Sequence, residues 1–441
     1  MRSGTLRGVD DRTVPTQTGG DPVQGIRITV ETGPDAGRTA MATTDAITIG
    51  TAEGNDLRLQ DETVSRFHLR VERSGARIEL IDQGSTNGTR VGVVELRGTS
   101  VRVDPGAVVQ IGATELRIED DRVEMVELGP SALGAIRGRT PKMRRLMAST
   151  KHLAQSDVPV LIVGESGTGK ELVARALHEH GARRDAPFVT VDCGVHTPTL
   201  FASELFGYVK GAFTGADADR EGAFERAHGG TLFLDEIGEL SPELQSSLLG
   251  VLQRGRFKRL GGQREIEVDV RVISATHRDL RGDVNARQFR LDLFYRLAVV
   301  VLTVPPLRER RDDIALLVRH ILEEVAPGTE VDDVFPPEEM RRLERHTWPG
   351  NVRELRNIVL GTLALGNPPD LREAAVGDVD AVERVLGMEY KPAKRLVLDD
   401  FERRFLEDLL QRAEGSVRKA ARLAKVDRNY LTELLRKHQL C

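Results

Sequence analysis

Residues 164–171 read Gly164-Glu165-Ser166-Gly167-Thr168-Gly169-Lys170-Glu171. The stretch follows an apolar run at 158–163 and precedes a helical pattern, which is the setting that a P-loop requires. Its glycines let backbone N–H groups close around phosphates, and Lys170 would be the point charge on the β- and γ-phosphates. Glu171 stands where Ser or Thr is usual, so this position offers no hydroxyl to a magnesium ion. The stretch predicts a nucleotide-binding domain.

Two carboxylates, Asp235 and Glu236, end a second apolar strand at 231–234. We expect Asp235 to hold Mg²⁺, directly or through water, and Glu236 to orient and deprotonate the water that attacks ATP. An alternative is a capping pair at a helix start, because Gly238 and Ser241 follow closely. Downstream of a P-loop this alternative loses most of its weight, and ATP and Mg²⁺ are the expected ligands.

The pattern around the P-loop predicts a parallel α/β sheet, because apolar strands alternate with helical segments from about residue 133. Before it, short runs of period two are broken by turn residues, which indicates an all-β sandwich. After Pro305-Pro306 the pattern is helical. The predicted segments are a disordered tail at 1–25, a β domain at 26–123, an α/β core at 133–305, a helical lid at 306–365, a linker at 366–394 and a helical C-terminal domain at 395–441.

Composition narrows the class of protein further. The chain has 441 residues, which suggests roughly three domains, and a net charge of −5, so any nucleic-acid-binding surface must be local. Cys193 and Cys441 are far apart, which argues for a reducing compartment and against disulfides or a zinc site. The start lacks an apolar core, and the longest apolar run, 297–304, is far shorter than a membrane helix needs. We expect a cytoplasmic protein without a membrane segment.

A small-residue loop carries one aromatic residue, in the sequence Gly211-Ala212-Phe213-Thr214-Gly215-Ala216. Such a loop suits a mobile hairpin tip, whose aromatic side chain is either tucked in or offered to a partner. Together with the P-loop, this spelling resembles that of the sigma-54-dependent transcriptional activators, bacterial enhancer-binding proteins built on the AAA+ ATPase fold. The resemblance implies that ATP hydrolysis drives the loop, through Phe213 and Thr214, to remodel the closed complex of sigma-54 RNA polymerase.

The same resemblance implies further parts of the ATPase. Residues 289–297 are similar to the arginine-finger segment of the family, with Arg290 and Arg296 acting on the neighbouring subunit's nucleotide in a homo-oligomer, from a dimer to a hexameric ring. Ordinary surface arginines on a helix are the alternative. Residues 348–355 resemble the lid signature, in which Arg353 is the second sensor and reaches the γ-phosphate.

Two positions depart from the family pattern. His277 stands at the end of a first-sensor strand, where Asn is common. Asp192 stands where the family often has an Asn that restrains the catalytic carboxylate, and an aspartate there would repel Glu236 unless one of the two is protonated. Asp192 is therefore a candidate catalytic residue whose role as a switch is open.

The β domain resembles a forkhead-associated (FHA) domain, a reader of phosphothreonine peptides. The resemblance rests on Ile49-Gly50, on 65–68 and on 84–89, and it puts Ser65, Arg66 and Thr86 near the phosphate and Asn87 on the peptide backbone. The family usually has Arg after the first glycine, where this chain has Thr51, so binding is weaker or Arg66 compensates. The alternative is a sandwich that only packs against the ATPase.

The C-terminal segment resembles the Fis-type helix-turn-helix of these activators, with a first helix at 416–424 and a recognition helix at 428–438. Lys425 replaces the usual turn glycine. A small helical oligomerisation tail is the alternative. The resemblance implies contacts to enhancer DNA from Arg428, Asn429, Tyr430, Thr432, Arg436 and Lys437.

Taken together, the resemblance implies a sigma-54-dependent activator, gated by a phosphothreonine-containing protein such as a Ser/Thr kinase or its substrate. Two alternatives stay open: a DNA-binding AAA+ regulator that acts without sigma-54, and an FHA scaffold with a silent ATPase.

Overall fold

The computed structural model describes residues 20–42, 46–74, 77–194 and 197–366, together with isolated positions between 406 and 437. The chain divides into two units, 1–367 and 368–441. Most of the second unit, including the predicted turn of the helix-turn-helix, lies outside the described residues. Of the predicted DNA contacts, Lys437 is described and exposed. The others, Arg428, Asn429, Tyr430, Thr432 and Arg436, lie outside the described residues.

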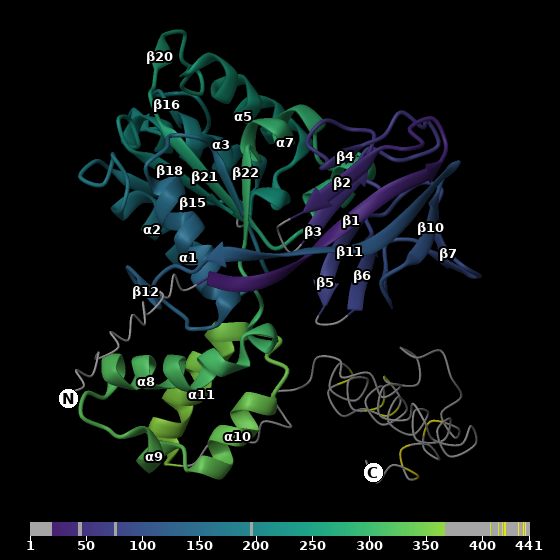
Figure 1. Cartoon of the computed structure of the whole chain (residues 1–441). Helices are drawn as coiled ribbons and strands as arrows, with labels where there is room; N and C mark the ends of the chain where they lie inside the picture. Colours follow the sequence, from purple (N-terminus) through teal and green to yellow (C-terminus); the bar gives the residue numbers. More distant parts are fainter. Residues whose placement is uncertain are drawn as a thin grey trace, which may run out of the picture. The chain divides into compact units, whose positions relative to one another are not determined.

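Two β-sheets form the N-terminal domain, which confirms the predicted all-β class (Figure 1). In spatial order the first sheet consists of β2 (Thr39–Ala42), β1 (Gly20–Thr32), β11 (Thr114–Glu127), β10 (Ala107–Ile111), β7 (Thr89–Val91) and β8 (Val94–Leu96). The second consists of β4 (Leu57–Arg58), β3 (Ala46–Gly50), β5 (Leu69–Ser74), β6 (Arg77–Asp82) and β9 (Ser100–Val103). Strands β1 and β11 pair from Gly20–Glu127 onward, so the strands extend beyond the predicted limits of 26–123.

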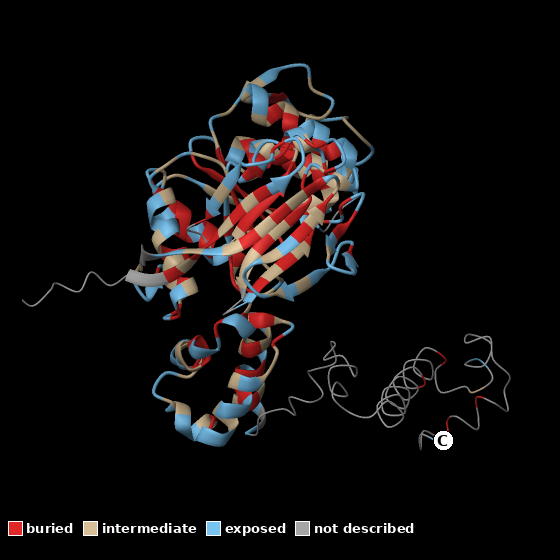
Figure 2. Ribbon diagram, turned by 45° about the vertical axis from the view of Figure 1, so that its right-hand side comes forward, coloured by how far each residue is buried: buried red, intermediate tan, exposed pale blue. Residues whose placement is uncertain are grey.

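The period-two pattern of the β domain produces its core. Along β6, every second side chain is buried, and Figure 2 shows buried and more accessible residues alternating along these strands. The buried side chains of the two sheets, almost all Ile, Val and Leu, join in one apolar cluster. Burial of that surface stabilises the sandwich by about 25 cal/mol per Å² of apolar area.

A five-stranded parallel sheet forms the α/β core, as predicted. Its order is β15 (Phe188–Asp192), β18 (Thr231–Asp235), β21 (Arg271–Thr276), β14 (Val160–Val163) and β22 (Val300–Thr303). Parallel strands are covered on both faces, which explains why β18 and β21 read as continuous runs of residues that the fold buries. The carboxyl ends of β14, β18 and β21 therefore meet at one edge, where the P-loop begins.

The helices of the core are α1 (Pro141–Ala154), α2 (Lys170–Glu179), α3 (Pro198–Phe206), α4 (Ala223–Arg226), α5 (Pro242–Arg254), α6 (Leu280–Asn285) and α7 (Leu291–Leu297). Short two-stranded ribbons join β12 (Ala132–Leu133) to β13 (Ile136–Arg137), β16 (Gly207–Tyr208) to β17 (Arg220–Glu221), and β19 (Arg256–Lys258) to β20 (Glu265–Glu267). Single 3-10 turns occur at η1 (Ile237–Glu239), η2 (Leu307–Glu309) and η3 (Arg311–Asp313).

Four helices follow and confirm the predicted lid: α8 (Ile314–Val325), α9 (Val331–Val334), α10 (Pro337–Arg345) and α11 (Asn351–Leu365). Trp348, just before α11, is fully buried, and its indole N–H donates to the Leu343 carbonyl at 2.9 Å. This bond ties the start of α11 to α10, so the residues that open α11 are held in place. No described helix has the length and apolar character needed to cross a bilayer.

Candidate functional site

The P-loop joins β14 to α2, and two of its glycines have left-handed backbones: Gly167 at φ +77° and Gly169 at φ +104°. Gly169 caps α2, so the first N–H groups of that helix face the loop and favour an anion. A Cβ on Gly167 would lie 2.3 Å from the Gly350 carbonyl oxygen. Both conformation and close approach therefore require glycine here.

Lys170 lies inside this loop with only 7% of its surface exposed. Its Nζ donates to the Gly164 carbonyl at 3.0 Å and to Glu236 Oε1 at 3.3 Å. A buried ammonium requires such partners, and phosphate oxygens could replace them. Glu171, one residue on, pairs with Arg175 one turn along α2 at 2.8 Å, and its side chain is half exposed. The position of the usual hydroxyl is thus occupied by a surface ion pair.

Glu236 follows β18 in a left-handed conformation at φ +52°, which is uncommon for a residue with a side chain and is often found at functional sites. Its Oε2 accepts the backbone N–H of His277 at 3.1 Å and the His277 ring Nδ1–H at 2.6 Å. Burial opposes ionisation most strongly, but the His277 bonds and the Lys170 charge outweigh it and hold the pKa of Glu236 below its ordinary value. The carboxylate is therefore ionised and aimed, as a general base requires.

The two aspartates of the site have different surroundings. Asp235 is held at the end of β18, where its Oδ1 accepts the Glu236 N–H at 3.0 Å; burial and the neighbouring Glu236 raise its pKa. Asp192 lies opposite Asp235 in the register of β15 and β18, and its Oδ1 accepts the Gly194 N–H at 2.8 Å. The hydrogen bonds to Glu236 thus come from His277 and Lys170, and the role of Asp192 as a switch stays a prediction. Sequence spacing gave no signal for the His277 contact.

His277 is expected to position Glu236, and this can be measured. His277→Ala removes the ring donor but keeps the backbone donor, so we expect kcat for ATP to fall roughly tenfold to a hundredfold with little change in KM. His277→Asn restores a side-chain N–H and should recover most of the rate. A change in KM alone, or an alanine variant as active as the wild type, would contradict this role.

Lid residues close directly on the P-loop. Arg353 Nη1 donates to Ser166 Oγ at 2.9 Å, which brings the predicted second sensor to the loop. Asn351, fully buried and left-handed at φ +52°, donates to the Ser166 carbonyl at 3.0 Å. Arg308 forms two bonds to the Glu165 carboxylate, at 2.8 and 2.6 Å, and lowers its pKa. Asn351 and Arg308 were not among the predicted site residues, because they contact the loop across more than 140 positions of the chain.

The two predicted arginine fingers are exposed on and beside α7, away from the P-loop contacts of their own chain. Arg290 precedes α7 and pairs with Asp292 at 2.7 Å, while Arg296 donates to the Leu252 carbonyl at 3.0 Å. Both guanidinium groups thus lie on the surface of the subunit, Arg290 in a two-bond pair with Asp292 and Arg296 on a backbone carbonyl.

The small-residue loop spans the tip of the β16–β17 hairpin, as predicted. Its turn is closed by the Gly211 N–H to the Ala216 carbonyl at 2.9 Å. Phe213 is half-buried and contacts the Tyr208 ring edge to face, with 4.9 Å between ring centroids, and Thr214 is exposed. The aromatic side chain therefore rests on its own hairpin, outside the apolar core of the domain.

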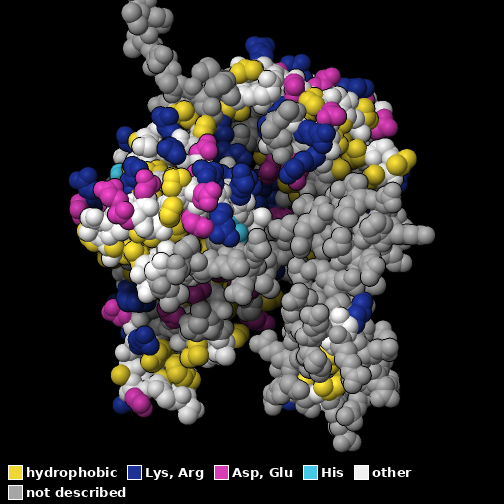
Figure 3. Space-filling view, turned by 90° about the horizontal axis from the view of Figure 1, so that it is seen from below, with side chains coloured by type: hydrophobic (Ala, Val, Ile, Leu, Met, Phe, Trp, Pro, Cys, Tyr) yellow, Lys and Arg dark blue, Asp and Glu magenta, His cyan; other side chains and the backbone are white. Residues whose placement is uncertain are grey.

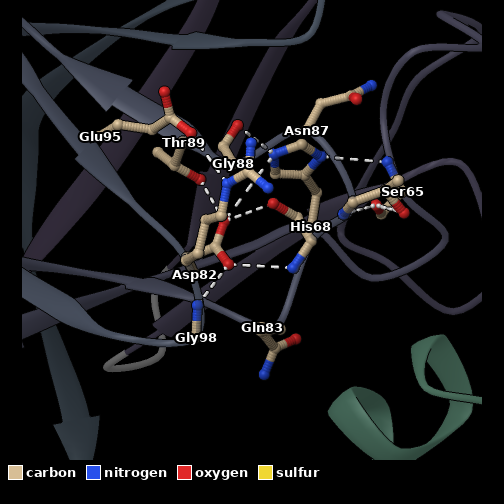
Figure 4. Close-up of polar contacts among 12 residues, drawn as sticks. Ser65, His68, Asp82, Gln83, Asn87, Gly88, Thr89, Glu95 and Gly98 are labelled. Atoms are coloured by element: carbon tan, nitrogen blue, oxygen red, sulfur yellow. Dashed lines mark hydrogen bonds and ion pairs between the residues drawn. The ribbon is translucent and has the colours of Figure 1, made fainter.

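Two of the phosphopeptide candidates, Ser65 and Asn87, lie on neighbouring loops of the β domain, on either side of His68 (Figure 4). Ser65 Oγ accepts the Thr86 N–H at 2.9 Å, and Asn87 Nδ2 donates to the Thr63 carbonyl at 2.8 Å. His68 is fully buried, accepts the Ser65 N–H at Nδ1 and donates from Nε2 to the Gly88 carbonyl, and burial lowers its pKa. Neutral His68 therefore fixes the two loops, which is a structural role.

The loop 65–68 of the β domain, which carries Ser65 and Arg66, also contacts α6 and α7. Phe67 is fully buried and contacts Phe294 edge to face, with 5.2 Å between centroids, and Arg281 lies over its ring at 5.4 Å. Asn285 Nδ2 donates to the carbonyls of Phe67 and Gln83, the latter at 2.9 Å. The sequence left two interpretations, a phosphopeptide reader and a sandwich that only packs, and these contacts show packing, which is compatible with both.

Arg66 and the first finger line the same hollow. Its volume is about 470 Å³, and Arg66 lies in its wall with Arg290, Asp292 and Tyr295.

Charged side chains of both signs are mixed on the surface: on the face seen in Figure 3, Lys and Arg lie among Asp and Glu. Among the described residues, no group of three or more His, Cys, Asp or Glu is arranged to hold a metal ion by itself.

Comparison with known proteins identifies related sequences for each part of the first unit. Residues 136–303 match the family described as "Sigma-54 interaction domain", and 308–376 match "AAA+ ATPase lid domain". Residues 29–122 match "Inner membrane component of T3SS, cytoplasmic domain". The chain is 44% identical over 307 residues to the transcriptional regulatory protein GlrR of Escherichia coli (strain K12), which covers 69% of this chain and 68% of GlrR.

Two solved structures are also similar. NtrX from Brucella abortus in complex with ATP is 34% identical, with 70% of each chain covered and a TM-score of 0.49. A structure from a study of phosphothreonine-dependent FHA domain interactions is 28% identical, with 22% of this chain and 95% of that chain covered and a TM-score of 0.20.

Proposed function

This chain belongs to the family of sigma-54-dependent transcriptional activators, AAA+ ATPases that act on sigma-54 RNA polymerase, and from that premise we propose that a phosphothreonine peptide gates its ATPase. The proposed unit of activity is a ring, in which Arg290 and Arg296 of one subunit act on the nucleotide of the next. The C-terminal segment anchors the ring on enhancer DNA, and the protein works in the cytoplasm. The Phe213 loop delivers the motion to sigma-54.

The roles proposed at the nucleotide follow from the geometry of the P-loop. The N–H groups at the start of α2 and the Lys170 ammonium hold the phosphates, and Arg353 reaches them from the lid. Asp235 is the residue that would hold Mg²⁺, since Glu171 is engaged with Arg175 on the surface. When bound, the metal ion neutralises charge on the phosphates. Glu236, aimed by His277, removes the proton from the attacking water.

The observation that carries the gating proposal is that one loop, 65–67, contains phosphate candidates and also packs against the ATPase core. Ser65 and Arg66 are the phosphate candidates, and Phe67, the next residue, is packed against Phe294 of the finger-bearing helix. A dianion bound at Ser65 pulls on a backbone that Asn285 also holds. Packed interfaces change between discrete arrangements, so a small shift here moves α7 and with it Arg290.

The test is ATP turnover by the full chain, with and without a peptide pool that carries a fixed central phosphothreonine. We expect the phosphorylated pool to change turnover at least threefold, and the unphosphorylated pool to have no effect. Ser65→Ala should abolish this response by removing the phosphate ligand, whereas Asn285→Ala should keep peptide binding and lose the response. A wild-type protein that binds the phosphorylated pool with unaltered turnover would contradict the gating, and one that does not bind this pool would favour a sandwich that only packs.

A further inference from the structure

The predicted phosphate site contains hydroxyl groups but lacks a guanidinium at the usual place. Thr51 N donates to the Ser65 carbonyl at 3.1 Å, so Thr51 lies beside the Ser65 loop. Ser65 Oγ lies 3.4 Å from Thr86 Oγ1. A phosphothreonine dianion bound by these three residues alone would lack a charge-assisted donor, the kind that makes phosphate recognition strong.

Arg58 lies beside Thr51 and carries the guanidinium group that Thr51 lacks. Strands β3 and β4 are parallel, and their register puts Arg58 opposite Gly50, the residue before Thr51. Arg58 Nε donates to the Thr51 carbonyl at 3.2 Å, which holds the guanidinium over that residue. Its Nη1 is 3.4 Å from Glu53, and 58% of the side chain is exposed, so this ion pair is loose enough to yield to a phosphate.

The surroundings of Arg58 leave room for a ligand. Arg58 and Thr51 line a hollow of about 730 Å³, together with Arg38, Gln60 and Val64. Arg38 is committed elsewhere: its Nη1 donates to Asp35 at 2.8 Å and to the Arg58 carbonyl at 2.7 Å. Arg38 thus fixes the backbone of Arg58, while the guanidinium of Arg58 stays available to the hollow.

We propose that Arg58, donated from the neighbouring strand β4, supplies to the phosphothreonine the guanidinium that Thr51 does not. This inference rests on the proposed phosphopeptide function and names the cation of that site. Arg66, the replacement suggested by the sequence, lines the other hollow, together with Arg290 and Tyr295 of the ATPase core. Arg58 therefore sets the affinity for the phosphate, and Arg66 belongs to the transmission of the signal.

The experiment measures binding of the full chain to two labelled peptide pools, one with a fixed central phosphothreonine and one with threonine. Arg58→Gln should lose roughly tenfold to a hundredfold in affinity for the phosphorylated pool, and Arg58→Lys should lose less. The double variant Thr51→Arg/Arg58→Gln should regain most of the affinity, because it returns a guanidinium to the same place. Arg77→Gln, an exposed arginine on β6, is the matched control and should bind as the wild type does.

The outcomes separate the two proposals. If the wild type prefers the phosphorylated pool and Arg58→Gln binds it equally well, the role of Arg58 is overturned while the phosphopeptide function stands. If Arg66→Gln loses affinity and Arg58→Gln does not, the cation is Arg66. If the wild type binds both pools alike, the phosphopeptide function fails, and the inference about Arg58 fails with it. Circular-dichroism spectra and melting temperatures equal to those of the wild type confirm that each variant is folded.

Discussion

Glu236→Gln is expected to bind ATP but to lower its turnover at least about a hundredfold, since a general base contributes roughly a hundredfold to ten-thousandfold. The amide keeps the shape of the side chain and can still accept the bonds from His277, so the loop geometry is retained. What is lost is the ability to take a proton. The measurements are kcat in steady state and binding of a fluorescent ATP analogue.

Glu239→Gln is the matched control for this variant. Glu239 is an exposed carboxylate three residues further on, in η1, with Arg278 at 3.6 Å as its ion-pair partner. It should keep turnover near that of the wild type, because it has no contact with the P-loop among the bonds described. Turnover of Glu236→Gln within about threefold of the wild type would assign the proton to another group, and Asp192 would be the next carboxylate to test.

Much of this site could be predicted from sequence because its parts are local. Apolar runs that end in Gly164 or in Asp235 identify strand ends, and parallel strands present their carboxyl ends at one edge. Strand β22 (Val300–Thr303) lies inside the apolar run 297–304, which the sequence considered only against the length of a membrane helix.

Long-range contacts account for the other misses. His277 reaches Glu236 only because β21 is the sheet neighbour of β18, an order that the chain does not reveal. Arg58 approaches Thr51 through the parallel register of β3 and β4. Asn285 meets Phe67 across 218 positions of the chain. Each contact depends on topology, which local periodicity does not encode. The residues of the P-loop and of the phosphate loops, by contrast, could be recognised from the local sequence alone.

Phe213→Ala is expected to lower activation of transcription from a sigma-54 promoter at least about tenfold. ATP turnover should stay within about twofold of the wild type. Phe213 rests on Tyr208 at the hairpin tip and contributes nothing to the buried core, so its loss leaves the fold intact. The hairpin is closed by backbone bonds that alanine retains. The Phe213 side chain is thus available to a partner, and its removal should abolish the contact with sigma-54 without disturbing the fold.

Transcription in vitro and ATP turnover are measured on the same preparation, with Asp217→Asn as the control. Asp217 is exposed on the same hairpin, and its backbone N–H, which bonds the Gly215 carbonyl, is unaffected by the change. If Phe213→Ala turns over ATP but does not activate transcription, the loop is needed to act on sigma-54 and is not needed for ATP hydrolysis. Full transcription in this variant would move the contact to Thr214 or off the hairpin, and a parallel loss of turnover would mean that the loop acts on hydrolysis itself.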